Sequence, residues 1–213
     1  NYTMLINLQE HYEGYNRAVR TLMGEIKKGK TRFTESDCFL VGEVITLQKK
    51  FETCIEVALG SAISNIITKN EVMAKTLIKY LKDNNMGRAT FLPINIIKGR
   101  KIPDKYKFKN IKGYIGIASE LLECKEGFIN VMEYILGRTI ICSDMDSALE
   151  IAKSSGYRFK IVTLLGDVVN PGGSLTGGSL QRRSSNIIGR KREIEETSVK
   201  IKNIQGYIKN SNE

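Results

Sequence analysis

Four glycines in two adjacent pairs are the first residues of this sequence whose spacing suggests chemistry. They lie within GDVVNPGGSLTGGS at residues 166–179, and they are Gly172, Gly173, Gly177 and Gly178. Glycine-rich loops often cradle phosphates, but a Walker A loop needs a Lys after its last glycine, where Gly178 stands here. The GxGxxG spacing of dinucleotide-binding loops is also missing, and a polar, broken stretch follows instead of a long helix. We therefore expect no nucleotide at this loop.

The same loop suits a contact between two protein backbones. The stretch VVNPGG reads as the end of a strand followed by a turn, and SLTGGS surrounds a single apolar residue, Leu175, with small ones. Glycine allows two backbones to approach closely, and a bare segment beside an edge strand can dock against another sheet. The sequence thus favours a protein–protein contact at residues 172–178, although one or two of the glycines could serve only a local turn.

Basic residues form the second candidate site. The chain has 213 residues and a formal net charge of +10, which favours polyanionic partners such as nucleic acid, although such a surplus can also serve solubility alone. Two groups flank the middle of the chain and are candidates for DNA contact: Lys27, Lys28, Lys30 and Arg32, then Arg182, Arg183, Arg190, Lys191 and Arg192. A third group is either a separate contact or a solvated linker: Lys98, Arg100, Lys101, Lys105, Lys107, Lys109 and Lys112.

No catalytic or metal-binding constellation is expected. The four cysteines have no CxxC spacing, and His11 is the only histidine, so neither a tetrahedral zinc set nor a catalytic triad suggests itself. No apolar run approaches the roughly 20 residues that span a bilayer, and NYTMLINLQEHYEG lacks the basic and apolar regions of a signal peptide. The chain also lacks an initiator Met, which suggests a piece of a longer protein.

Both ends of the chain carry heptad patterns that would position these sites. Apolar residues alternate at spacings of three and four through residues 1–28, and isoleucines recur through the last stretch. Because neither segment is long enough to be stable alone, the pattern predicts that the two ends pair as an antiparallel coiled coil below a globular middle. Two unrelated terminal helices packed on the core are the alternative. The residues are Leu5, Leu8, Tyr12, Tyr15, Val19, Leu22 and Ile26, then Ile187, Ile194, Ile201, Ile204 and Ile208.

The middle of the chain reads as two similar α/β units. Strands are predicted at SNIIT, RATFLPI, RTIICSD and KIVTLLGDVV, and helices at FETCIEVALG, EVMAKTLIKYLKDNN, EGFINVMEYILG and MDSALEIAKSSG. Gly42 and Gly116, Ile66 and Ile140, and Ala74 and Ala148 match at one offset, while Gly60 and Gly137 match at a slightly larger one. The predicted fold is α/β (α+β), with arms at 1–32 and 186–213, subdomains at 33–97 and 113–185, and a basic linker at 98–112.

These residues carry a resemblance to a known family. NPGGSLTGGS preceded by LLGDVV closely resembles the signature of the hinge domain of bacterial or archaeal structural maintenance of chromosomes (SMC) proteins. FETCIEVALGSAISNIIT, AKTLIKYLKDNNMGRATFLPI and GYIGIASELL agree with the same family, whereas CFLVGEVITL is a loose version of its opening strand. The resemblance covers the whole middle, and the heptads match the place where the two long arms enter the hinge.

The resemblance implies a function for the chain. In this family two hinges close into a ring-like homodimer, with the first subdomain of each chain against the second subdomain of the other. The four glycines and Leu175 would lie at that contact, and DNA would be contacted non-specifically near the arm junction. The hinge uses no cofactor, and the ATPase heads and the sites for kleisin and accessory subunits lie elsewhere in a cytoplasmic, nucleoid-associated protein.

Two other functions remain open on the sequence. A sequence-independent nucleic-acid-binding module with incidental self-association would fit the basic groups equally well. A nucleotide-dependent enzyme would need the glycine loop to bind phosphate, contrary to the motif requirements above. The first is distinguished by whether charge reversal at Arg190–Arg192 removes DNA binding alone, and the second by calorimetry with ATP and magnesium.

Overall fold

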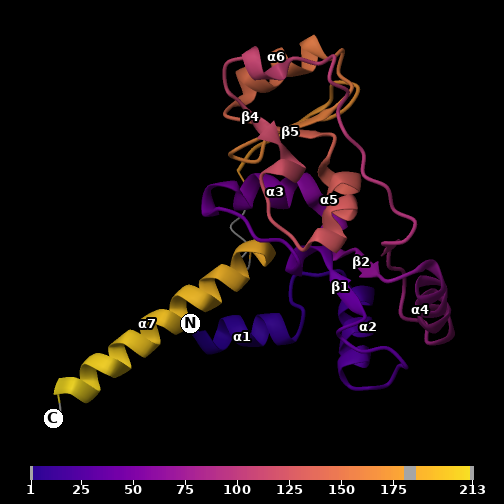
Figure 1. The fold of residues 1–213 in the computed structure, drawn as a ribbon, viewed down its shortest axis with the longest axis vertical. Helices are drawn as coiled ribbons and strands as arrows, with labels where there is room; N and C mark the ends of the chain where they lie inside the picture. Colours follow the sequence, from indigo (N-terminus) through magenta and orange to yellow (C-terminus); the bar gives the residue numbers. More distant parts are fainter. Residues whose placement is uncertain (1, 180–185, 212–213) are drawn as a thin grey trace.

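The computed structural model describes residues 2–179 and 186–211, which form two small β-sheets with helices packed around them (Figure 1). The first sheet has the order β1-β2-β3 and the second β4-β5-β6-β7-β8. β2 runs parallel to β3 and β5 parallel to β6, and all other pairs are antiparallel. The fold is mixed α/β, as predicted. The strands are β1 Cys38–Leu40, β2 Ile66–Thr68, β3 Phe91–Pro93, β4 Tyr114–Ile117, β5 Thr139–Cys142, β6 Lys160–Thr163, β7 Val168–Val169 and β8 Leu175–Thr176.

Seven α-helices accompany these strands in the described ranges. The four helices predicted in the middle are all present, and Asn70 and Asp144 cap the amino ends of α4 and α6 with their side chains. The helices are α1 Tyr2–Glu10, α2 Arg17–Lys27, α3 Glu52–Leu59, α4 Glu71–Asp83, α5 Ile129–Leu136, α6 Met145–Ser154 and α7 Ile187–Ser211. No helix in 2–179 or 186–211 is both long and apolar enough to cross a lipid bilayer.

The predicted internal repeat is present, with one correction to its register. The series β1–α3–β2–α4–β3 has the same order and pairing directions as β4–α5–β5–α6–β6. α3 and α5 begin 77 residues apart (129 − 52), whereas the caps of α4 and α6 are 74 apart (144 − 70). The longer connection from α3 to β2 accounts for the difference. Gly42 therefore corresponds to residue 119 (42 + 77), so its predicted match to Gly116 is wrong.

The two units contact each other through equivalent residues, as expected for an internal two-fold axis. Thr46 and Glu123, which are 77 residues apart and hence equivalent, form an isolated antiparallel bridge in which each backbone N–H donates to the other's carbonyl, at 2.9 and 2.7 Å. One hydrophobic core runs through both units, and its fully buried members include Leu22, Ile55 and Leu136. The predicted boundaries of the subdomains stay a prediction.

The basic linker is packed along the protein rather than being fully solvated. Phe108 is buried against the second sheet, and the guanidinium of Arg100 stacks on the ring of Tyr134 at 4.4 Å. Lys101 forms an ion pair with Glu133 at 2.9 Å. Part of this cationic group therefore serves the attachment of the linker to α5.

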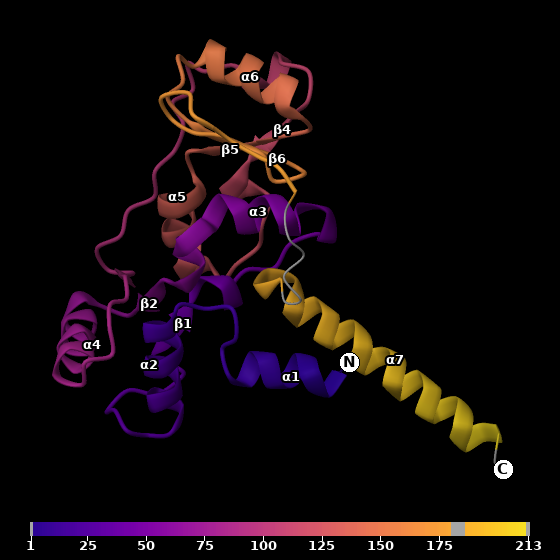
Figure 2. The same ribbon diagram turned by 180° about the vertical axis from the view of Figure 1, so that it is seen from behind.

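The predicted continuous helix over residues 1–28 is wrong. α1 lies beside α7 and runs in the opposite direction, but the chain then bends before α2 (Figures 1 and 2). The apolar residues of α2 are buried in the core. Val19, Leu22 and Ile26, predicted to pair with the C-terminal helix, are at most 3% exposed in that core. A coiled coil that caps the middle is thus not confirmed, since only α1 accompanies α7. The heptad spacing did not reveal the bend because core and coiled-coil helices share a similar apolar stripe.

Candidate functional site

The glycine loop forms a hairpin at the edge of the second sheet. Val168 pairs with Thr176 and Val169 with Leu175, and the backbone N–H of Asn170 donates to the carbonyl of Ser174 at 2.8 Å. β8 is the last strand in the order, so one side of its backbone has no strand beside it among the described residues. An unpaired strand edge can accept a strand of another chain.

Each glycine of the loop is also favoured by the conformation of the hairpin itself. Gly172, Gly173 and Gly178 adopt φ values of +87°, +98° and +127°, which side chains rarely tolerate. At Gly177 a Cβ would lie 2.5 Å from Oδ1 of Asp167. The same carboxylate accepts the N–H of Gly178 at 3.3 Å, so a negative charge already stands where a phosphate would bind. This geometry supports the sequence argument against a phosphate loop.

Two leucines near the two ends of β7 are exposed. Leu175 on β8 is 56% exposed, and Leu165 in the turn between β6 and β7 is 77% exposed. A large apolar side chain exposed on an edge strand, like that of Leu175, is typical of a contact surface. Sequence analysis missed Leu165 because it lies in the run KIVTLLGDVV, which was read as one strand; the Gly166–Asp167 turn signal within that run could have revealed it.

Arg190, one of the predicted DNA contacts on α7, is not free for DNA. Arg190 is only 3% exposed, and its Nη1 and Nη2 donate to the carbonyls of Leu8 and Glu13 at 2.9 and 2.6 Å. Burial lowers the pKa of its guanidinium, against the opposing effect of nearby Tyr15 and Glu43. The charge-reversal test at Arg190 would therefore break the structure before it tested DNA binding.

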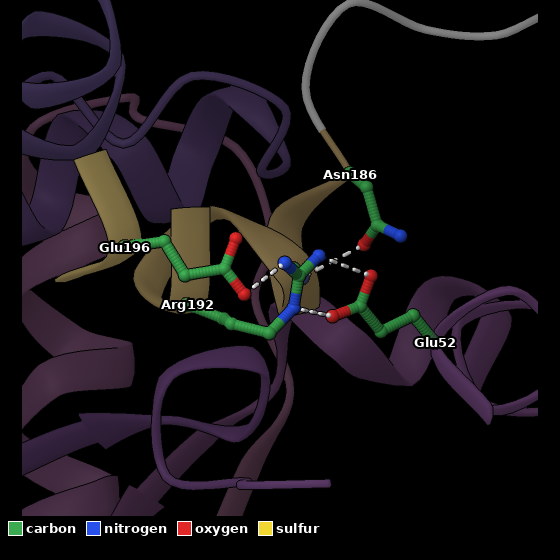
Figure 3. A network of polar contacts seen from close by, with 5 residues as sticks. Glu52, Asn186, Arg192 and Glu196 are labelled. Carbon is green, nitrogen blue, oxygen red and sulfur yellow. Dashed lines mark hydrogen bonds and ion pairs between the residues drawn. The ribbon is translucent and has the colours of Figure 1, made fainter. Parts of the chain in front are cut away.

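Arg192 also has a structural role. Its guanidinium lies between two carboxylates, donating to Glu52 on α3 at 2.6 and 3.1 Å and to Glu196 at 2.8 Å (Figure 3). These bonds raise the pKa of Arg192. A Cβ at Gly189 would lie 2.6 Å from Oε2 of Glu52, so a larger residue there would displace the Glu52 carboxylate from its present position. Asn186, labelled in the same view, accepts the N–H of Gly189 and caps α7.

The remaining predicted cations are exposed but only partly brought together. Lys27 and Lys191 line one groove, in which Glu43 and three further glutamates, at 10, 35 and 195, offset their charge. Burial raises the pKa of Glu43 to about 6. Lys28, Lys30 and Arg32 lie beyond the end of α2, where Lys30 pairs with Glu25. Arg182 and Arg183 fall outside the described residues.

Arg32 reveals a neighbouring surface that sequence analysis missed. Its Nη2 donates to Oγ1 of Thr76 at 3.1 Å, so the loop after α2 lies against α4. The exposed face of α4 carries Lys75 and Lys82. Nothing in the linear pattern signalled this proximity, because 44 residues separate the two hydrogen-bonded side chains. Several exposed cations therefore lie at the α2–α4 end of the first unit.

The described residues contain no group of three His, Cys, Asp or Glu side chains placed to hold a metal ion. Their four cysteines are unpaired thiols, three of them buried, and burial raises the pKa of Cys38 to about 12 and that of Cys54 to about 11. Such thiols are unreactive because the thiolate is disfavoured.

Comparisons with known proteins settle the family. The family described as "SMC proteins Flexible Hinge Domain" matches residues 35–152, more than half of the chain. The chain belongs to the SMC hinge family. It is 66% identical over 203 residues to the chromosome partition protein Smc of Clostridium kluyveri (strain NBRC 12016), and 46% identical over 195 residues to that of Desulfitobacterium hafniense (strain Y51).

These matches cover 95% and 92% of the chain but only 17% and 16% of the two relatives. A solved SMC hinge domain, an asymmetric dimer from Geobacillus stearothermophilus, resembles the structure with a TM-score of 0.84 at 33% identity. That match covers 98% of this chain and 82% of the solved one. The SMC hinge thus corresponds to a short segment of much longer chromosome partition proteins.

Proposed function

We propose that this SMC hinge joins two copies of its chain into a ring-like homodimer through the edge strand β8. The supporting observation is the β7–β8 hairpin: among the described residues no strand lies on the outer side of β8, and Leu175 on that strand is exposed. The second subdomain of one chain would meet the first subdomain of the other, in two equivalent contacts about a two-fold axis. Closed symmetry of this kind uses each contact twice and leaves no edge open.

The glycines are poor targets for testing this contact, since their backbone angles serve the hairpin itself. Leu175→Glu places a charge on the exposed face of β8 without a change at any of the four glycines. We expect a folded monomer by size-exclusion chromatography with light scattering, whereas the unchanged chain should be a dimer. Val199→Glu is the matched control, because Val199 on α7 is 57% exposed and lies away from β8. A Leu175→Glu chain that remains dimeric would refute the assignment.

The proposal includes non-specific DNA contact at the cations that the structure leaves exposed. These are Lys27, Lys28, Lys30, Arg32 and Lys191; Arg182 and Arg183 remain candidates, whereas Arg190 and Arg192 act within the chain. Each neutralised phosphate contributes about −0.9 to the slope of log affinity against log salt. Replacing Lys28, Lys30 and Arg32 by Gln should therefore make the slope less steep by about 2 to 3.

A triple Gln replacement of Lys105, Lys107 and Lys109 removes the same charge from the linker and is the control. An equal effect of both triples would show that net charge alone acts. DNA binding by monomeric Leu175→Glu is informative too, since unchanged affinity per chain would favour a nucleic-acid-binding module whose self-association is incidental.

For the longer protein we propose an ATP-driven role in chromosome partition, with ATPase heads and kleisin-binding sites outside this segment and a cytoplasmic, nucleoid-associated location. The hinge itself would need no cofactor. Calorimetry of this chain with ATP and magnesium should show no heat beyond dilution, and tight binding would contradict the view of the glycine loop given above.

A further inference from the structure

Two buried side chains at the junction of the terminal helices with the first unit each carry a polar atom without a partner. Tyr15, in the segment before α2, is 6% exposed, and Arg190 on α7 is 3% exposed. The hydroxyl of Tyr15 and Nε of Arg190 have no hydrogen-bond partner among residues 2–179 and 186–211. Most buried polar groups in proteins bond either to another protein group or to ordered water, because an unpaired one is costly. These two atoms therefore require a ligand.

The two side chains lie close together. A Cβ at Gly42 would lie 2.8 Å from the hydroxyl oxygen of Tyr15 and 2.9 Å from Cγ2 of Ile187, so these two atoms are neighbours. Arg190 follows Ile187 by three residues and hence lies on the same face of α7. Its Nη2 would lie 3.6 Å from a Cβ at Gly14, the residue before Tyr15. One ligand can therefore contact both side chains.

Two carboxylates belong to the same cluster. Burial raises the pKa of Tyr15 and lowers that of Arg190, and each of these groups opposes the shift of the other. Glu43 and Glu56 raise the pKa of both, so their carboxylates lie near both. Both glutamates are half-buried, and Glu43 also lines the groove between α1 and α7. Solvent thus has a path to the cluster.

The chemistry of these groups determines which ligand fits. Nε of Arg190 can only donate a hydrogen bond, and the hydroxyl of Tyr15 carries a second hydrogen to donate. The ligand must therefore accept two hydrogen bonds, which excludes an ammonium ion. A halide could accept both, but the nearby carboxylates would repel it. Water accepts two hydrogen bonds and has two hydrogens of its own, for which the carboxylates are acceptors.

We propose that ordered water bridges the hydroxyl of Tyr15 and Nε of Arg190, and donates to the carboxylate of Glu43 or Glu56. The bridge joins the segment before α2, the first turn of α7 and the body of the first unit at one site. It adds a contact to the body for Arg190, whose Nη1 and Nη2 already bind backbone carbonyls at the end of α1 and just beyond it. This inference concerns one chain and does not rest on the proposed dimer or DNA contact.

A crystal structure of the chain tests the bridge directly. We expect electron density for ordered water at about 2.7 to 3.2 Å from the hydroxyl oxygen of Tyr15 and from Nε of Arg190. A second crystal grown with sodium bromide identifies the ligand, because bromide gives an anomalous signal and water does not. An anomalous peak at this site would overturn the assignment of water. A direct bond from either atom to a protein group, or no density beside them, would overturn the bridge.

Tyr15→Phe gives a second test, in which the sign of the change decides. Removal of a buried hydroxyl that has no partner should leave stability unchanged or increase it. Removal of a hydroxyl that bonds to ordered water should instead raise the equilibrium constant for unfolding about fivefold, as measured by urea denaturation. Tyr207→Phe is the control, because Tyr207 on α7 is 76% exposed, and it should change nothing. Unchanged or increased stability of Tyr15→Phe would overturn the bridge.

Discussion

The ion pair between Glu52 and Arg192 determines how α7 is fixed to the globular body, and its two partners should respond unequally to mutation. Glu52 is 7% exposed and accepts two hydrogen bonds from Arg192. Arg192→Met therefore leaves a nearly buried carboxylate without its partner. We expect that to cost about 2–3 kcal/mol of unfolding free energy. Glu52→Gln should cost only about 1 kcal/mol, because Arg192 keeps Glu196 and its side chain is 23% exposed.

Urea unfolding followed by circular dichroism at pH 7 measures the change in unfolding free energy for each single variant and for the double variant. If the pair acts as a unit, the double variant should cost at least about 1 kcal/mol less than the sum of the two single changes. Glu196→Gln is the control, since its exposed ion pair should contribute about 0.5 kcal/mol or less. Additive single effects, or a larger cost for Glu52→Gln than for Arg192→Met, would refute this account of the contact.

Three further predictions use the same unfolding measurement. Gly137→Ala should lower stability by about 3 kcal/mol, since its Cβ would overlap the carbonyl oxygen of Arg100, whereas Gly127→Ala, with open space around it, should change little. Asn70→Ala should cost about 1 kcal/mol through loss of the α4 cap, and retention of full stability would contradict that. Burial raises the pKa of Glu43 in the folded chain to about 6, which is higher than its pKa in the unfolded chain. The free energy of unfolding of the unchanged chain should therefore fall as the pH rises from about 4.5 to 6. Glu43→Gln should remove that fall, and an identical pH profile would show that Glu43 is not its source.

Local signals in the sequence predicted most of the fold. Asn70 and Asp144 predict the starts of α4 and α6, because helix capping depends only on neighbouring residues. Short apolar runs predict the strands β2 and β5. What the sequence did not reveal depends on partners far along the chain. In the sequence Arg190 resembles a solvated charge in a polar helix, yet its side chain is buried and donates hydrogen bonds to carbonyls 177 and 182 residues away. The bend between α1 and α2 was not predictable for the same reason.

The two arms are attached to the globular body in different ways, and α3 explains the difference. Its amino end holds α7 through Glu52 and Arg192, and its carboxyl end accepts hydrogen bonds from Nζ of Lys160 on β6, at 3.0 Å to Ala58 and 3.4 Å to Val57. Both charges complement the helix dipole. Because β6 belongs to the sheet that ends in β8, α7 has a fixed direction relative to the proposed dimer contact.

α1 has no comparable anchor. It is held by Arg190 of α7 and by the turn at residues 11–16, where Tyr12 and Gly14 have φ values of +53° and +92°. A weakening of these contacts should therefore move α1 and leave α7 in place. A change in arm geometry at this hinge should therefore appear as motion of the N-terminal arm. Hydrogen exchange separates the two cases: Gly14→Ala should speed exchange in α1 while the first turn of α7 keeps its protection, and equal loss in both helices would contradict this asymmetry.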